Sequence, residues 1–245
     1  MHSVCELEAV IVSADASVIT SMTECLGELG IHANVEARSS AIEMLFKRKM
    51  DAFFIDRDSD PGLSVIERVR SSPSSRTAVT FAIVQGSDAS GVALRRADFV
   101  IDKPLTHDRV RRSLRASYGI MLKERRRYTR YALQGEAKLK DSTGRTFLAT
   151  TTNISQTGLA LECEAPLIEG ESVEVQFQLP HSKKSSSIQA QVIWTAANGK
   201  AGLAFTRMRA ADREILTEWI DGEFLRQWHP FIPEGVAERF MQGAR

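Results

Sequence analysis

The first half of the chain repeats one pattern, in which a short apolar run is followed by a segment with apolar residues at helical spacing. Continuous apolar runs are typical of strands buried on both faces, as in a parallel sheet covered by helices. The pattern therefore predicts a doubly wound α/β domain with a five-stranded parallel sheet over residues 1–122. The predicted strands are residues 9–12, 32–37, 52–55, 79–84 and 99–101, and the predicted helices are 16–29, 40–49, 63–70, 89–96 and 106–122.

Beyond residue 130 the pattern changes to short alternating runs separated by turn residues. Alternation of apolar and polar residues is typical of strands with one buried face, and closely spaced strands favour a small antiparallel barrel. The last periodic segment carries an apolar stripe, which predicts a C-terminal helix across the barrel mouth. The predicted strands are 137–140, 146–154, 158–163, 173–179, 188–194 and 202–205, with a polar loop at 181–187 and the helix at 212–228; residues 229–245 are assigned to no element.

A basic segment, residues 123–130, lies between these two patterns and contains Arg126 and Arg130 at the spacing RxxxR. Downstream, a turn between two predicted strands contains the pattern NxSxxG, formed by Asn153, Ser155 and Gly158. Guanidinium groups are planar, permanently charged donors that suit phosphate oxygens and the edge of guanine. Asparagine and serine add short polar contacts, and glycine permits a tight turn or a close backbone approach. Together the two patterns favour a small anionic ligand that carries phosphate and guanine.

The order RxxxR then NxSxxG, with strand-like segments at 191–194 and 202–205 after them, resembles the PilZ family of cyclic di-GMP receptors. The resemblance covers roughly the second half of the chain, and its specificity comes from the order and spacing of the motifs. It implies cyclic di-GMP as the ligand. The binding residues that it implies are Arg125, Arg126, Arg130, Asn153, Ser155 and Gly158, with Arg125 expected to matter less because it falls off the RxxxR spacing. The alternative interpretation is a solvated linker followed by an ordinary hairpin.

The first half of the chain resembles the receiver domain of response regulators. Asp56 ends the third predicted strand, where that family keeps its phospho-accepting aspartate, and Lys103 follows the fifth strand, as the family's lysine does. Ser13 and Ala14 replace the acidic pair that holds Mg²⁺ in the family, and Gln85 replaces a threonine or serine. A hard cation needs several oxygen ligands, and phosphoryl transfer depends on that metal. We therefore expect a pseudo-receiver in which Asp56 and Lys103 are a vestigial phospho-site.

The composition argues against several other classes of protein. A net charge of +1 does not favour a nucleic-acid binder driven by overall charge. The three cysteines form no CxxC pair and the five histidines have no metal-ligand spacing, so we expect neither a metal nor a cofactor. No nucleophile, base and acid can be assembled into a specific set, so we expect no enzymatic activity. No apolar run reaches transmembrane length and no signal-peptide pattern is present, which favours a cytoplasmic protein.

These observations predict a bacterial signalling protein with a receiver-like domain at 1–122, a loose basic linker at 123–130 and a PilZ barrel with its helix at 131–245. We expect cyclic di-GMP to bind at the linker and barrel. Binding would change the arrangement of the domains and the interaction with a downstream protein partner, and a homodimer is compatible with the sequence. Two alternatives remain open: a PilZ-fold adaptor that binds no nucleotide, and a response regulator controlled by phosphorylation.

Overall fold

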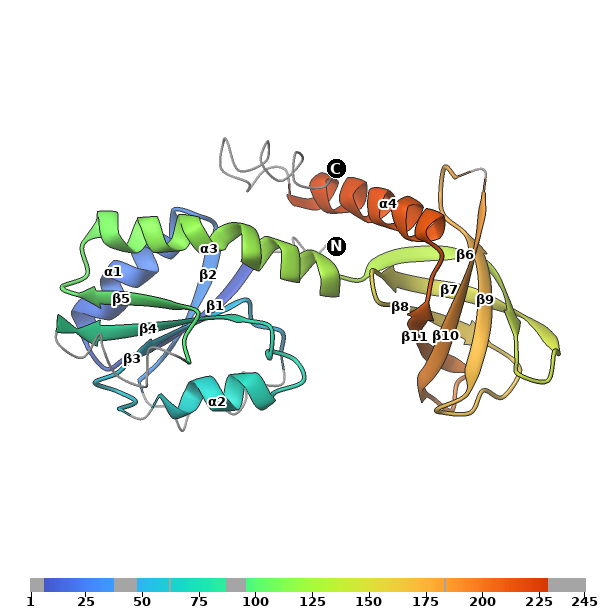
Figure 1. The fold of residues 1–245 in the computed structure, drawn as a ribbon, viewed down its shortest axis with the longest axis horizontal. Coiled ribbons are helices and arrows are strands. Elements are labelled where there is room, and N and C mark those ends of the chain that lie inside the picture. Colours follow the sequence, from blue (N-terminus) through green and yellow to red (C-terminus); the bar gives the residue numbers. More distant parts are fainter. Residues whose placement is uncertain (1–6, 38–47, 62, 87–95, 183, 229–245) are drawn as a thin grey trace. The chain divides into compact units, whose positions relative to one another are not determined.

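The computed structural model describes residues 7–37, 48–61, 63–86, 96–182 and 184–228 (Figure 1). The chain forms two compact units: the first is Met1–Arg125 with Gln227–Arg245, and the second is Arg126–Arg226. The predicted helix at 40–49 and the predicted helix at 89–96 lie almost entirely outside the described residues, as does the tail at 229–245.

The first unit is built on a parallel sheet with the strand order β2-β1-β3-β4-β5. Its strands are β1 (Leu7–Val12), β2 (Ile31–Glu36), β3 (Ala52–Asp56), β4 (Val79–Gln85) and β5 (Phe99–Lys103). Helices α1 (Ala16–Gly27) and α3 (His107–Tyr128) cover one face of the sheet, and α2 (Ser64–Ser71) covers the other (Figure 1). Flavodoxin and CheY have sheets with this strand order. The predicted doubly wound five-stranded fold is confirmed.

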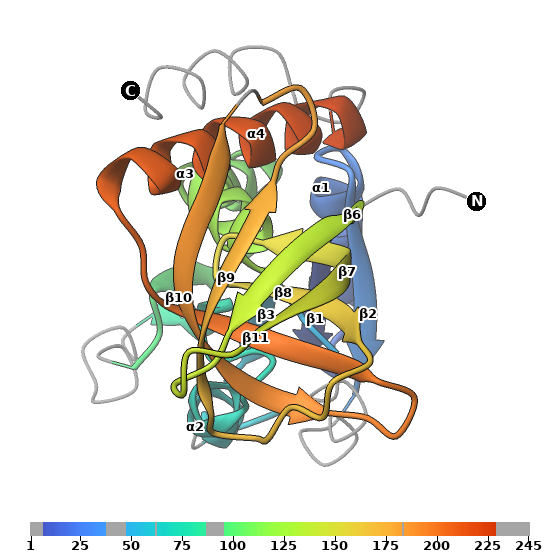
Figure 2. The same ribbon diagram turned by 90° about the vertical axis from the view of Figure 1, so that its right-hand side faces the viewer.

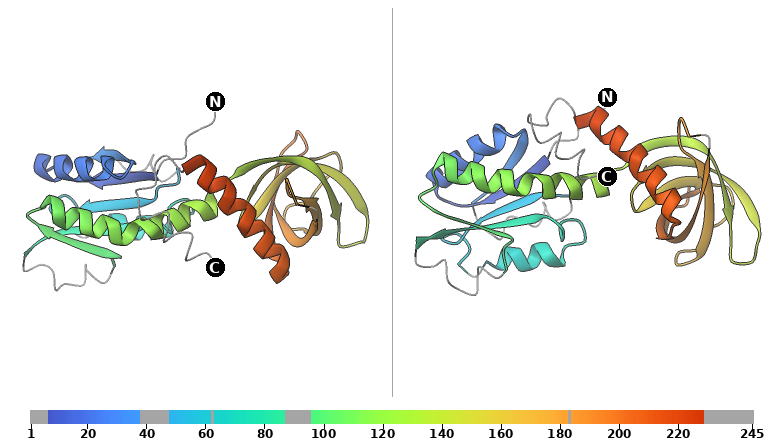
Figure 3. Two further views of the ribbon diagram at one scale, coloured as in Figure 1. Left: turned by 90° about the horizontal axis from the view of Figure 1, so that it is seen from above. Right: turned by 45° about the horizontal axis from the view of Figure 1, so that its top comes forward.

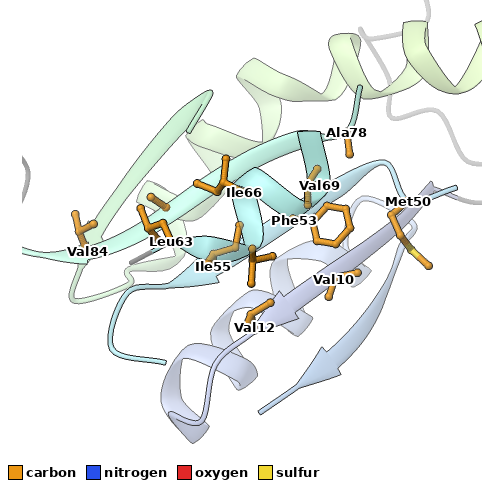
Figure 4. Close-up of a cluster of buried hydrophobic side chains, with 12 residues drawn as sticks. Val10, Val12, Met50, Phe53, Ile55, Leu63, Ile66, Val69, Ala78 and Val84 are labelled. Atoms are coloured by element: carbon orange, nitrogen blue, oxygen red, sulfur yellow. The ribbon is translucent and has the colours of Figure 1, made fainter. Parts of the chain in front are cut away.

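Apolar side chains hold α2 against the sheet. Val12, Phe53 and Ile55 from two neighbouring strands form one buried cluster with Ile66 and Val69 of α2 (Figure 4). The cluster forms because alternate residues of a strand point to the same face, and the apolar side of α2 meets them there. Because all pairings in this sheet are parallel, the carboxyl ends of its strands lie at a common edge, where α/β sheets place their ligand sites.

The second unit contains a closed antiparallel barrel with the strand order β10-β11-β8-β7-β6-β9 (Figure 2). Its strands are β6 (Tyr131–Lys140), β7 (Thr146–Ser155), β8 (Gly158–Cys163), β9 (Ser172–Gln178), β10 (Ser185–Thr195) and β11 (Lys200–Arg207). Buried and exposed side chains alternate along β9, as the sequence pattern predicted. The predicted six-stranded barrel is confirmed.

A last helix, α4 (Ala210–Trp228), packs on the barrel unit. Its Leu216, Ile220 and Phe224 are buried, and these residues share one side of the helix. The ring of Trp219 meets Tyr131 edge-on, with 6.2 Å between the ring centroids, so α4 lies at the end of the barrel where β6 begins. The predicted C-terminal helix is confirmed.

Helix α3 extends further than the sequence predicted. The apolar spacing suggested an end near residue 122 and a loose linker at 123–130, but α3 continues as one helix to Tyr128 (Figure 3). The prediction of a loose segment was wrong for residues 123–128 because two of the arginines find carboxylate partners. Arg125 pairs with Asp51 and Arg126 with Asp221, so the expected repulsion is neutralised within the protein.

Several strands are also longer than predicted, β6 and β10 among them. β6 begins at Tyr131 and β10 at Ser185, so most of the predicted loop at 181–187 belongs to a strand or to the short turn before it. The serines at the start of β10 are polar, and this polarity predicted a loop. Their backbone groups pair with β9, and Ser186 is buried opposite Phe177. Strand pairing satisfies the backbone regardless of side-chain polarity, so the barrel overrides the local signal.

Gly158, the first residue of β8, is required by a close approach of two strands. A Cβ atom at this position would lie 2.3 Å from the backbone oxygen of Leu203 in β11. Real Cβ atoms do not approach this closely, and the backbone oxygen cannot rotate away as a flexible side chain could. The glycine therefore permits the contact between β8 and β11 that helps to close the barrel.

We expect Gly158→Ala to lower the free energy of unfolding of the barrel unit by about 1–3 kcal/mol, the usual cost of overpacking. Urea unfolding followed by tryptophan fluorescence measures this, because all three tryptophans lie in the second half of the chain. The matched control is Gly135→Ala in β6, where a new Cβ would lie 3.8 Å from Thr151 Oγ1, an ordinary contact. Equal stabilities of the two variants would contradict the prediction.

Candidate functional site

The carboxyl edge of the first sheet holds Asp56, the last residue of β3, in a buried ion pair. Lys103 Nζ lies 2.9 Å from Asp56 Oδ1, and Ser13 donates a hydrogen bond to Asp56 Oδ2 at 2.7 Å. Lys103 also pairs with Asp58 at 2.6 Å. Burial by itself would lower the pKa of Lys103, but hydrogen bonds and charge from Asp58 and Asp56 raise it above its ordinary value. The structure thus brings Asp56 and Lys103 together, and each oxygen of Asp56 already has a side-chain donor.

Two other polar residues at this edge, Ser13 and Asp15, act through hydrogen bonds. Ser13 is buried and donates a hydrogen bond to Asp56. Asp15 caps α1 by accepting from the backbone N–H of Ser17. Within the described part of the chain, no group of three or more acidic, histidine or cysteine side chains is placed to hold a metal ion. Asp56 thus has Lys103 and Ser13 as side-chain partners.

Arg125 makes its contacts in the first unit. Its Nη1 lies 3.3 Å from Asp51 Oδ2 and 3.4 Å from the backbone oxygen of Lys49. Asp51 is fully buried, and burial raises its pKa to about 6 although Arg125 and the backbone N–H of Glu8 oppose the shift. Asp51 Oδ1 is buried with no hydrogen-bond partner among the described residues. The structure therefore gives Arg125 a role in neutralising Asp51.

Arg126 and Arg130, the two residues of RxxxR, have different surroundings in the second unit. Arg126 Nη1 lies 2.6 Å from Asp221 Oδ1 of α4, and only 12% of the Arg126 side chain is exposed. Burial raises the pKa of Asp221 above its ordinary value, and Arg126 opposes that shift. Arg130 is exposed in the short segment between α3 and β6, and no described carboxylate forms an ion pair with it.

The three residues of NxSxxG lie at or near the turn between β7 and β8 and have different structural roles. Ser155 Oγ is 3.3 Å from the backbone oxygen of Gly158 and accepts the backbone N–H of Thr157, so it shapes the turn. Asn153 lies in β7 between Ala132 of β6 and a residue of β8. Its Oδ1 is buried and has no hydrogen-bond partner among the described residues. Asn153 is thus the member of the motif with an unused buried acceptor.

The strand register brings the two motifs to one edge of the barrel. Tyr131 of β6 pairs with Ile154 of β7, and Ala132 pairs with Asn153. Arg130 precedes Tyr131, so its backbone lies next to the start of the β7–β8 turn. The backbone of Arg130 and the buried amide oxygen of Asn153 therefore lie near one end of β7.

A family comparison matches this part of the chain: residues 124–222 fit the model of the PilZ domain. Residues 124–222 form a PilZ domain. The match begins just before the RxxxR arginines, takes in the whole barrel and ends one residue beyond Asp221 in α4. The resemblance inferred from the two motifs is confirmed at the level of the domain.

Three solved structures are each similar to part of the chain. MotI/DgrA, an inhibitor of motility from Bacillus subtilis, is 19% identical over 41% of this chain and 52% of its own, with a TM-score of 0.36, so the match spans about half of that protein. The PilZ domain of CeSA from a cellulose-synthesizing bacterium is 17% identical over 39% of this chain and 97% of its own, with a TM-score of 0.33. A CheY-like receiver domain from Methylobacillus flagellatus is 24% identical over 46% of this chain and 98% of its own, with a TM-score of 0.41. No curated protein sequence matches the chain.

A hollow in the PilZ domain lies at the other end of β7. It encloses about 1400 Å³ and is lined by Phe147, Leu148 and three glutamates, Glu136, Glu162 and Glu164, with Lys200 as the lining cation. Lys200 already pairs with Glu162 at 3.4 Å. This excess of carboxylates disfavours a dianionic ligand there. The hollow is therefore a poorer anion site than the edge that carries RxxxR and NxSxxG.

Sequence reasoning missed both carboxylates that engage the arginines. Asp51 and Asp221 carry no motif, and Asp221 is 95 residues away from Arg126. The one available signal for Asp221 was its place on the partly polar helix that follows the barrel. None of the helices in the described residues combines the length and hydropathy needed to span a membrane.

We expect the chain to resist phosphorylation by acetyl phosphate and Mg²⁺, because Asp56 is paired with Lys103 and the described residues hold no group of three or more potential metal ligands. Intact-mass spectrometry measures the modification. The control is Asp56→Asn, which removes the phosphate acceptor. Stoichiometric phosphorylation of the wild type that is absent from Asp56→Asn would show that the first domain is an active receiver.

We also expect a pH dependence that comes from Asp51. Because burial raises its pKa from 3.8 in the unfolded chain to about 6, the folded protein binds this proton more tightly. The stabilisation from proton binding is fully present below 3.8 and is lost as the pH rises through about 6. As the pH falls from neutral to about pH 4.5, the free energy of unfolding of wild type should therefore rise relative to that of Asp51→Asn.

Urea unfolding at several pH values, followed by circular dichroism, measures that difference. Asp102→Asn, which removes an exposed carboxylate from β5, is the matched control and should track the wild type. A difference between wild type and Asp51→Asn that stays constant with pH would contradict the assignment.

Proposed function

We propose that this chain is a cytoplasmic bacterial signalling effector that binds cyclic di-GMP through its PilZ domain and has no enzymatic activity. The observation that carries this proposal is the register of β6 against β7, in which Tyr131 pairs with Ile154. In that register the backbone of Arg130 lies beside the turn formed by NxSxxG, which supports a shared site for residues that are remote in the sequence.

The chemistry of this edge fits each part of the proposed ligand. Arg130 is exposed and lacks a described carboxylate partner, so it can bind a phosphodiester without first losing an ion pair. The buried Oδ1 of Asn153 is an acceptor that guanine N–H groups can satisfy. Ser155 and Gly158 act through the turn, one by hydrogen bonding within it and the other by permitting the approach of β11.

In this proposal the first domain presents a surface to a downstream protein partner. Its sheet and core are intact, while Asp56 is neutralised by Lys103 rather than prepared for phosphorylation. A folded domain without its metal chemistry can still contact another protein.

We further propose that the ligand acts on the junction between the domains. Only Thr129 and Arg130 separate α3 from β6, and Arg126 lies in the last turn of that helix. A ligand that contacts both arginines would order this junction and favour one arrangement of the domains over others.

A PilZ-fold adaptor that binds no nucleotide is the second candidate. The observation that favours it is the ion pair of Arg126 with Asp221, because one arginine of RxxxR already has an anionic partner in the folded chain. An adaptor would use that pair only to attach α4 to the barrel unit.

We expect Arg130→Ala to weaken cyclic di-GMP binding by about a hundredfold, since a charge-assisted hydrogen bond contributes a few kcal/mol. Isothermal titration calorimetry of the full chain measures the affinity, and hydrogen exchange of residues 121–131 during the same titration should show added protection around Arg130. The matched control is Arg127→Ala, which removes an exposed arginine off the RxxxR spacing and should bind as wild type does.

Equal affinity of wild type and an Arg126→Ala/Arg130→Ala variant would reject the assignment of these arginines. Absence of binding to the wild type and to every variant would favour the adaptor. Binding without a change in exchange would leave the ligand assignment intact and reject the proposed effect on the junction.

A further inference from the structure

The ion pair between Arg126 and Asp221 is well covered. The two charged atoms lie 2.6 Å apart, and 12% of the Arg126 side chain and 18% of the Asp221 side chain are exposed. Surface ion pairs exchange readily with water, but covered pairs are screened less and lose more when one partner is removed. The carboxylate of Asp221 is therefore a strong internal ligand for this guanidinium.

Helix α4 fixes the position of Asp221 by contacts that do not involve its charge. The neighbouring Ile220 is fully buried, as is Phe224 one turn later. Trp219 packs edge-on against Tyr131, which begins β6. Because these apolar contacts anchor the helix, the carboxylate is held at Arg126 without the entropy loss of a free surface side chain.

We propose that Asp221 is an affinity-determining residue of the cyclic di-GMP site, an internal carboxylate that occupies Arg126 until a phosphodiester of the ligand replaces it. This inference rests on the proposed function of the PilZ domain. The exchange replaces one singly charged anion on Arg126 by another, so the Arg126 contact adds little net affinity. The favourable binding free energy that drives the exchange comes from Arg130, which has no described carboxylate partner.

The affinity for the ligand then depends on how often the pair of Arg126 and Asp221 is open. Ligand can use Arg126 only in the fraction of molecules in which the Asp221 pair is open, and the apparent dissociation constant rises as that fraction falls. A ligand with a single anionic group would bind Arg130 and leave the pair closed. A ligand with two phosphodiesters can bind Arg130 and displace Asp221 in one binding event, so the pair favours dianionic ligands.

The test is calorimetric titration of the full chain with cyclic di-GMP, comparing wild type with Asp221→Asn. The variant keeps the shape of the side chain and removes its charge. We expect its affinity to rise by roughly 5- to 150-fold, the range typical of coupled binding events. The matched control is Glu218→Gln, an exposed carboxylate on the same helix, which should bind as wild type does.

A thermodynamic cycle separates competition from a structural effect. In an Arg126→Ala background, Asp221→Asn should leave the affinity unchanged, because the two side chains act through each other. Without ligand, Asp221→Asn should melt at a lower temperature than wild type, since Arg126 loses its counter-charge, and saturating ligand should raise its melting temperature more than that of wild type. If Asp221 had only a structural role, Asp221→Asn would lower both the melting temperature and the affinity.

Each outcome of these experiments supports or contradicts a stated proposal. Tighter binding by Asp221→Asn, or binding where wild type shows none, supports the inference. Unchanged or weaker binding by a folded Asp221→Asn overturns it while the proposed function stands, and absence of binding in every protein rejects the proposed function itself. If Asp221→Asn does not fold, the comparison of the two arginines decides: Arg126→Ala should cost less affinity than Arg130→Ala, and a greater cost would overturn the inference.

Discussion

The antiparallel pairing of β6 with β7 is the constraint on which the candidate site depends. Tyr131 and Ile154 are partners across this ladder, so the segment that precedes β6 and the turn that follows β7 emerge at the same edge. Side chains alternate between the two faces of a strand, and a shift of one residue would exchange the buried and exposed sets of β6. The same hydrophobic burial that fixes the barrel therefore fixes which polar groups meet.

Neighbouring arginines in one basic segment have separate physical roles. Arg125 neutralises the buried Asp51, Arg126 pairs with Asp221, and Arg130 is exposed. A basic run read as a single electrostatic feature would predict similar roles for all of them. Their environments differ because successive residues of a helix point in different directions, about 100° apart, and so meet different partners. The exposed Arg130 lies beyond the end of that helix.

The first domain separates its apolar core from the polar groups at its carboxyl edge. At that edge Lys103 pairs with Asp56, and Ser13 donates a hydrogen bond to the same carboxylate. The apolar cluster that holds α2 on the sheet is formed by other residues of the same sheet and of α2. Stability and chemistry are carried by different residues of the same strands.

Local patterns in the sequence were sufficient for the class of each domain and for most strands, because hydrophobic periodicity reflects burial directly. They also identified RxxxR and NxSxxG, since those residues are close together within each motif. The tertiary structure decided what local patterns cannot encode: the register that joins the motifs, the contact of β8 with β11 that requires Gly158, and the remote carboxylates Asp51 and Asp221 that engage Arg125 and Arg126. A salt bridge leaves no periodic trace, because it depends on the distance between two charges in space and not on their separation along the chain.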